Sequence, residues 1–80
     1  MKIKTIFFGI TTDLVNASEL QIEVERNTSI DGFKSILKNK FSTLEQIDSY
    51  AIAVNEEYAE GEIVLKESDV VAIIPPVSGG

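Results

Sequence analysis

The last six residues of the chain hold the group with the clearest chemical use, the main-chain carboxylate of Gly80. They read Pro75-Pro76-Val77-Ser78-Gly79-Gly80 and follow the apolar run 70–74. Proline removes a backbone N–H that would continue a sheet, and glycine has no Cβ to obstruct a narrow cleft. We therefore expect residues 75–80 to form a flexible tail with an unhindered Gly80 carboxylate. The alternative is an ordinary frayed, glycine-rich chain end.

The composition leaves few side chains that could perform catalysis. The sequence contains no cysteine and no histidine, so it lacks a thiolate nucleophile, the commonest general base and the commonest zinc ligands. We expect no metal site and no cofactor bound by the chain itself. The sequence also lacks a GxxxxGK[ST] phosphate loop, so any ATP must be bound by another protein.

The size and charge of the chain limit its partners. Eighty residues with 44% apolar content predict one domain, residues 1–74, followed by the tail 75–80. The net charge of −6 argues against nucleic acid and favours a basic or neutral protein surface as the partner. No apolar run is long enough to span a membrane, and the N-terminal residues do not resemble a signal peptide. We expect a cytoplasmic protein.

The apolar pattern predicts four strands. Residues 2–8 place Ile3, Thr5 and Phe7 on one face and Ile6 and Phe8 on the other. Residues 19–25 alternate as a half-buried strand, and residues 10–18 are expected to form a polar connection with a loose turn. Residues 50–54 and 70–74 predict the third and the final strand. Between residues 58 and 69 we expect a brief strand or turn, anchored by Ile63 and Leu65, and a polar corner at 66–69.

One helix is predicted over about residues 29–41. Thr28 and Ser29 offer hydroxyl caps, and apolar residues recur at helical spacing from Ile30 to Phe41. Gly32 lies inside this helix, which suggests a close approach to the sheet. Residues 42–49 are expected to be irregular.

This order, β-β-α-β-(β)-β, predicts the α+β β-grasp architecture of ubiquitin, a mixed sheet packed on one main helix. The first and last strands are then parallel neighbours in the centre of the sheet. If Val71 and Ile73 point inward, the outward residues form an apolar patch beside the tail, which we interpret as a partner interface. A strand phase shifted by one residue would instead place these side chains in the core. The patch consists of Ile6, Phe8, Val70, Ala72 and Ile74.

Three segments together resemble a known family, the small subunit of molybdopterin synthase, which is the MoaD type of ubiquitin-like sulfur carrier. They are Ile6-Phe7-Phe8-Gly9, Ala53-Val54-Asn55-Glu56-Glu57-Tyr58 and the end of the chain from Asp69 to Gly80. A Gly-Gly end alone is a weak signal, whereas an apolar strand followed by Pro-Pro-Val-Ser-Gly-Gly is a strong one.

The resemblance implies that the chain is a non-catalytic carrier subunit whose C-terminal glycine bears sulfur. A ubiquitin-activating-like adenylyltransferase would use ATP to adenylate Gly80, and a sulfur donor would convert the adenylate to a thiocarboxylate. The tail, residues 75–79, would then carry Gly80 into the active site of the large synthase subunit, in a complex expected to be a heterotetramer. There the sulfur would pass to a cyclic pterin precursor. Four residues beyond Pro76 reach at most about 13–14 Å.

Three other functions remain open at this point. A thiamine-pathway sulfur carrier and a ubiquitin-like protein modifier share the Gly-Gly end, although Pro75-Pro76-Val77 favours the molybdopterin type. A pure interaction domain with an inert tail would belong to a different class of protein. Deletion of Gly79 and Gly80 separates the last alternative from the others.

Overall fold

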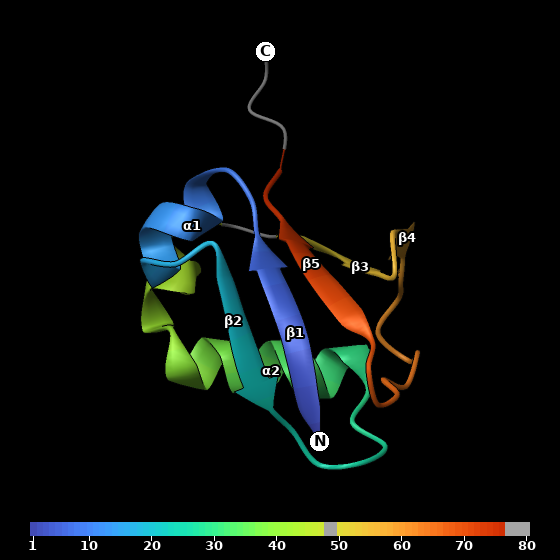
Figure 1. Ribbon diagram of the computed structural model, residues 1–80. Helices are drawn as coiled ribbons and strands as arrows, with labels where there is room; N and C mark the ends of the chain where they lie inside the picture. Colours follow the sequence, from blue (N-terminus) through green and yellow to red (C-terminus); the bar gives the residue numbers. More distant parts are fainter. Residues whose placement is uncertain (48–49, 77–80) are drawn as a thin grey trace.

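The computed structural model describes residues 1–47 and 50–76. Its strands form one mixed sheet in the order β2-β1-β5-β3-β4 (Figure 1). In chain order the elements are β1 (Lys2–Phe7), α1 (Ile10–Val15), β2 (Glu19–Glu23), α2 (Ile30–Lys40), the 3-10 helix η1 (Ser42–Gln46), β3 (Ala51–Val54), β4 (Glu57–Tyr58) and β5 (Val70–Ile74).

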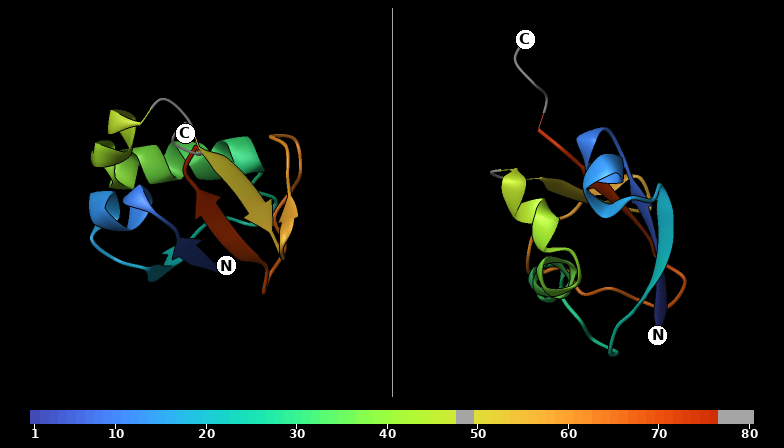
Figure 2. Two further views of the ribbon diagram at one scale, coloured as in Figure 1. Left: turned by 90° about the horizontal axis from the view of Figure 1, so that it is seen from above. Right: turned by 90° about the vertical axis from the view of Figure 1, so that its left-hand side faces the viewer.

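The sheet has the predicted β-grasp topology. β1 and β5 run parallel in its centre, and β1–β2, β3–β5 and β3–β4 are antiparallel pairs. Helix α2 crosses one face of the sheet, as the two turned views show (Figure 2). Within residues 1–47 and 50–76, no helix lies over the opposite face. The last strand is therefore both central and parallel to the first, as the sequence predicted.

The core lies between α2 and the inward face of the sheet. Phe33 and Leu37 of α2 are completely buried, as are Ile3 of β1 and Val71 and Ile73 of β5. Because side chains alternate across a strand, their neighbours in β1 and β5 point to the other face. Of the two strand phases left open for residues 70–74, the structure has the one with Val71 and Ile73 inward.

Helix α2 begins at the cap that the sequence suggests. The Ser29 hydroxyl accepts a hydrogen bond from the Gly32 backbone N–H at 3.1 Å, which satisfies one of the free donors of the first turn. The expected reason for Gly32 is wrong: a Cβ there would meet Thr28 at 3.3 Å and Ser29 at 3.5 Å. The glycine makes room for the capping loop and not for the sheet.

The predicted loose turn at residues 10–18 is wrong in part, since Ile10–Val15 form helix α1. The helix starts at a threonine-closed turn: the Thr11 hydroxyl donates to the Phe8 carbonyl and accepts from the Phe8 N–H. It ends at Asn16, whose φ of 60° is left-handed. The fully buried Thr11 and the buried Val15 attach this short helix to the end of the sheet.

The segment between β3 and β5 matches the prediction in part. Leu65 is buried, but Ile63 is 50% exposed, so the expected Ile63 anchor is wrong. Ile63 contributes its backbone carbonyl, which accepts the Ile30 N–H, while its side chain stays half exposed. The polar corner is present, because the Lys66 N–H donates to the Asp69 carboxylate at 2.7 Å. The predicted irregular stretch at 42–49 contains η1, with Leu44 buried.

In the described residues, 1–47 and 50–76, no helix is long and apolar enough to cross a membrane. No group of three or more acidic, cysteine or histidine side chains there is arranged to hold a metal ion.

Candidate docking surface and tail root

The uncovered face of the sheet carries the predicted apolar patch. In the β1–β5 register Ile6 lies beside Ala72, and in the β3–β5 register Ala51 lies beside Ile74. Ile6, Ala72 and Ile74 are partly exposed, and Phe8 just beyond β1 is 48% exposed. The structure therefore brings the outward residues of the two central strands onto one face, while their role as a partner interface stays a prediction.

The patch contains a shallow hollow of about 430 Å³. Ile74 belongs to the same face but does not line the hollow. Two of its lining residues, Asn55 and Glu56, were not among the predicted interface residues. The signal that could have found them is the two-residue link between β3 and β4, which returns the chain to this face. The lining residues are Ile6, Phe8, Asn55, Glu56, Val70 and Ala72.

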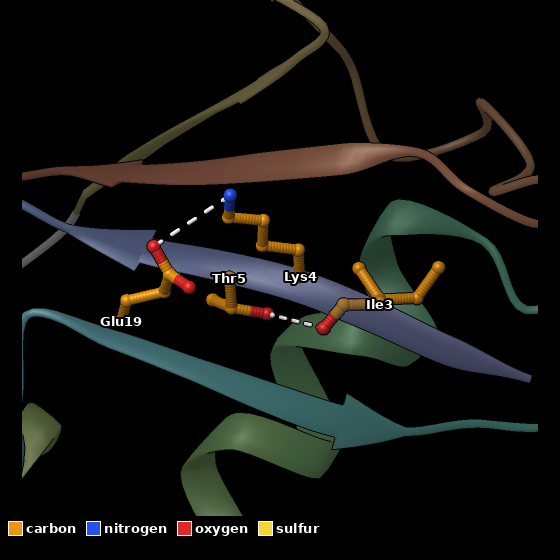
Figure 3. Close-up of polar contacts among 4 residues, drawn as sticks. All are labelled: Ile3, Lys4, Thr5 and Glu19. Carbon is orange, nitrogen blue, oxygen red and sulfur yellow. Dashed lines mark hydrogen bonds and ion pairs between the residues drawn. The ribbon is translucent and has the colours of Figure 1, made fainter.

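The hollow is bordered by a polar pair on the same face. Lys4 of β1 lies beside Val70 of β5 in the sheet register, and its ammonium group is 3.7 Å from the Glu19 carboxylate of β2 (Figure 3). On the inward face, the fully buried Thr5 hydroxyl donates to the Ile3 carbonyl at 3.2 Å. Lys4, which lies beside the patch on β1, thus already has an anionic partner.

The root of the tail is fixed by a close contact between Gly9 and Pro75. Gly9 has a φ of +54°, a region that glycine adopts readily and other residues rarely. A Cβ at Gly9 would lie 3.0 Å from Cγ of Pro75. The turn after β1 therefore needs glycine both for its backbone conformation and for the space that Pro75 fills.

The predicted tail is described only at its beginning. Pro75 is partly buried and Pro76 is exposed. The predicted reactive residue Gly80 and the tail residues Val77, Ser78 and Gly79 lie outside the described residues. Their roles stay predictions, as does the division into residues 1–74 and 75–80.

The sequence matches the model of the ThiS family over residues 5–80. Among curated proteins, it is 31% identical over 81 residues to the molybdopterin synthase sulfur carrier subunit of Arabidopsis thaliana. That alignment covers all of this chain and 84% of the plant protein.

Solved structures of similar proteins have the same fold. A candidate molybdopterin converting factor subunit 1 of Pyrococcus furiosus matches with a TM-score of 0.88 and 26% identity, over 96% of this chain and 99% of that one. A complex of subunits 1 and 2 of the molybdopterin-converting factor of Helicobacter pylori contains a chain that matches with a TM-score of 0.71 and 27% identity, with full coverage of both chains. The chain described here is a member of the ThiS family with the ubiquitin-like β-grasp fold of MoaD-type sulfur carriers.

Proposed function

We propose that this chain is the sulfur carrier subunit of a molybdopterin synthase and that Gly80 carries the sulfur. The observation that supports this most is the extent of the similarity. The family match reaches residue 80, and the alignment with the Arabidopsis carrier subunit covers the entire chain. The similarity therefore includes the Pro-Pro-Val-Ser-Gly-Gly end and not only the β-grasp body.

The proposed chemistry takes place at the main chain. A free carboxylate is a poor electrophile, so Gly80 is first joined to AMP by an activating enzyme, with ATP as the AMP donor. A sulfur donor then displaces AMP and leaves a thiocarboxylate on Gly80. This sulfur passes to the cyclic pterin precursor in the large synthase subunit, where it forms part of the dithiolene that binds molybdenum. The chain's own lack of Cys and His fits a carrier that leaves acid–base chemistry to its partners.

The large subunit is the proposed partner of the uncovered sheet face. The Helicobacter pylori match is a complex of subunits 1 and 2, and its matching chain has this fold over its full length. On this chain the apolar patch lies beside Pro75, where the tail begins. Docking through the patch would bring the tail to the same partner, within a reach of about 13–14 Å beyond Pro76.

The activating enzyme and the sulfur donor are further proposed partners. Because the chain has no phosphate-binding loop of its own, the activating enzyme supplies the ATP site. We place the cycle in the cytoplasm, where ATP is available to that enzyme. Repeated use of one acidic chain by several enzymes suits a small carrier that is steered by its charge of −6.

Deletion of Gly79 and Gly80 tests the proposal in a reconstituted synthase. The reaction contains the large subunit, the activating enzyme, ATP, a sulfur source and the pterin precursor, and molybdopterin formation is measured. We expect the deletion variant to yield no product while its Tm equals that of the native chain. A variant with Gly32→Ala serves as a control for an unrelated glycine and should remain active. Product formation by the deletion variant would refute the carrier role of Gly80.

A further inference from the structure

The link between β3 and β4 has an unusual backbone for its sequence. Val54 and Glu57 are paired in the ladder, so Asn55 and Glu56 form a two-residue hairpin turn. Their φ angles are 51° and 73°, both left-handed, which is the pattern of a type I′ turn. Asn is well suited to the first position, but glycine is the preferred residue at the second. Glu56 therefore occupies a position where glycine would relieve strain.

This turn is held firmly against the start of β5. The Asn55 side chain accepts a hydrogen bond from the Val70 N–H at 3.0 Å and donates one to the Asp69 carboxylate at 3.0 Å. The Asn55 N–H also donates to the Val70 carbonyl at 2.8 Å. Three hydrogen bonds thus fix the position of the turn, and Glu56 is carried at a defined place on the rim of the hollow.

The hollow combines apolar walls with one acidic group. Ile6, Phe8, Val70 and Ala72 supply its apolar lining. Glu56 is the one charged residue among the described residues that line it. The nearest cation by strand register is Lys4, which is paired with Glu19 on the neighbouring strand.

We propose that the hollow receives an arginine or lysine side chain of the large synthase subunit. Its aliphatic stem packs on the apolar walls, and its charged head pairs with the Glu56 carboxylate. The net charge of −6 favours a basic partner surface. The inference rests on the proposed function and adds a role for the Glu56 carboxylate, which selects the partner surface that fits. Glu56 does so although glycine at this position would make the turn more stable.

The test compares three variants of the full-length chain in binding to the large synthase subunit. Glu56→Gln removes the charge, and Glu56→Gly removes both the charge and the strain. Glu57→Gln is the matched control, because it removes the same charge one residue further on, outside the hollow. Kd is measured by calorimetry at low and high NaCl concentration, and Tm is measured for each free chain.

We expect Glu56→Gln and Glu56→Gly to weaken binding by about 5-fold or more, and to make Kd less dependent on salt. Glu56→Gly should also raise Tm by about 4 °C or more. Glu57→Gln should bind like the native chain. If Glu56→Gln binds as tightly as the native chain, this inference is wrong and the carrier role stands. If the native chain itself does not bind the large subunit, both the proposed function and this inference are overturned.

Discussion

Gly9 is the residue on which the geometry of the tail root depends. It combines a left-handed φ of +54° with a 3.0 Å approach of its Cβ position to Pro75. The first property is a backbone requirement, and the second is a steric one. The sequence placed Gly9 at the end of the first strand, but it could not show the contact with Pro75, because the two residues are 66 positions apart along the chain.

Replacing Gly9 with alanine should therefore destabilise the domain and disturb the start of the tail. We expect the free energy of unfolding to fall by about 1–3 kcal/mol, because alanine is strained at this φ. Urea denaturation of Gly9→Ala and of the native chain measures the difference. An unfolding free energy equal to that of the native chain would show that the turn relaxes without cost.

Tyr50 is the residue whose protonation should change stability at high pH. Partial burial raises the pKa of the Tyr50 phenol above its ordinary value of 10.0. The unfolded chain then releases this proton at lower pH than the folded chain does. The contribution of Tyr50 to stability is complete below pH 10 and is lost as the pH rises through the folded pKa.

The variant Tyr50→Phe isolates this effect, since it removes the ionising hydroxyl and keeps the ring under the Lys34 ammonium. Between about pH 8 and pH 11 the native chain should lose more unfolding free energy than the variant does. Urea titrations across this range give the comparison. Parallel pH profiles for the two proteins would contradict the assignment.

Along strand β5, buried core residues alternate with residues that are partly exposed on the uncovered face. Ile73 is fully buried, while its neighbour Ile74 is partly exposed on the uncovered face. The sequence left this phase open, because all five residues of the strand, Val70 to Ile74, are apolar. The alternating burial along β5 in the structure decides between the two phases.

Substitutions on the two faces of the sheet should consequently have opposite effects. Ile73→Ala should lower the free energy of unfolding by about 2–5 kcal/mol through the cavity that it leaves. Phe8→Glu and Ile74→Glu should change stability by about 1 kcal/mol or less and should weaken binding to the large subunit. Calorimetric unfolding and a pull-down with that subunit measure the two effects. Unfolding as the main consequence of Phe8→Glu would mean that this face is structural.

Helix α1 could not be predicted from local sequence, for a physical reason. Its six residues, ITTDLV, include β-branched side chains with low helix propensity. Its supports come from distant parts of the chain, including the Thr43 hydroxyl, which donates to the Leu14 carbonyl at 2.5 Å. Helix α2 has local sequence signals of a helix, namely a capping serine and a regular apolar stripe. It was predicted to within one residue at each end.

The sequence predicted the residues of the candidate site that lie on or next to the two central strands. It missed the two residues that lie in a turn. Ile6, Phe8, Val70 and Ala72 all line the hollow, as expected for neighbouring strands. Asn55 and Glu56 were missed, because a register between β3 and β4 is needed to see that their turn reaches the same face. The position of the turn also depends on hydrogen bonds between Asn55 and Val70, which are 15 positions apart and which no local pattern encodes.

At the scale of the whole molecule, the described body consists of a sheet with one face packed on α2 and the other face open. The open face adjoins Pro75, where the sequence continues toward Gly80. The body therefore has the layout expected of a domain that binds a partner through its open face while the C-terminal carboxylate reacts. This division explains why a chain without Cys or His can take part in sulfur transfer.

The most direct measurement of the central claim is the intact mass of the full-length chain after incubation with its activating enzyme, ATP and a sulfur source. The account predicts a gain of about 16 Da, the replacement of one oxygen by sulfur, located by fragmentation at Gly80. A chain whose mass is unchanged, or one recovered only as an isopeptide between Gly80 and a lysine of another protein, would contradict it.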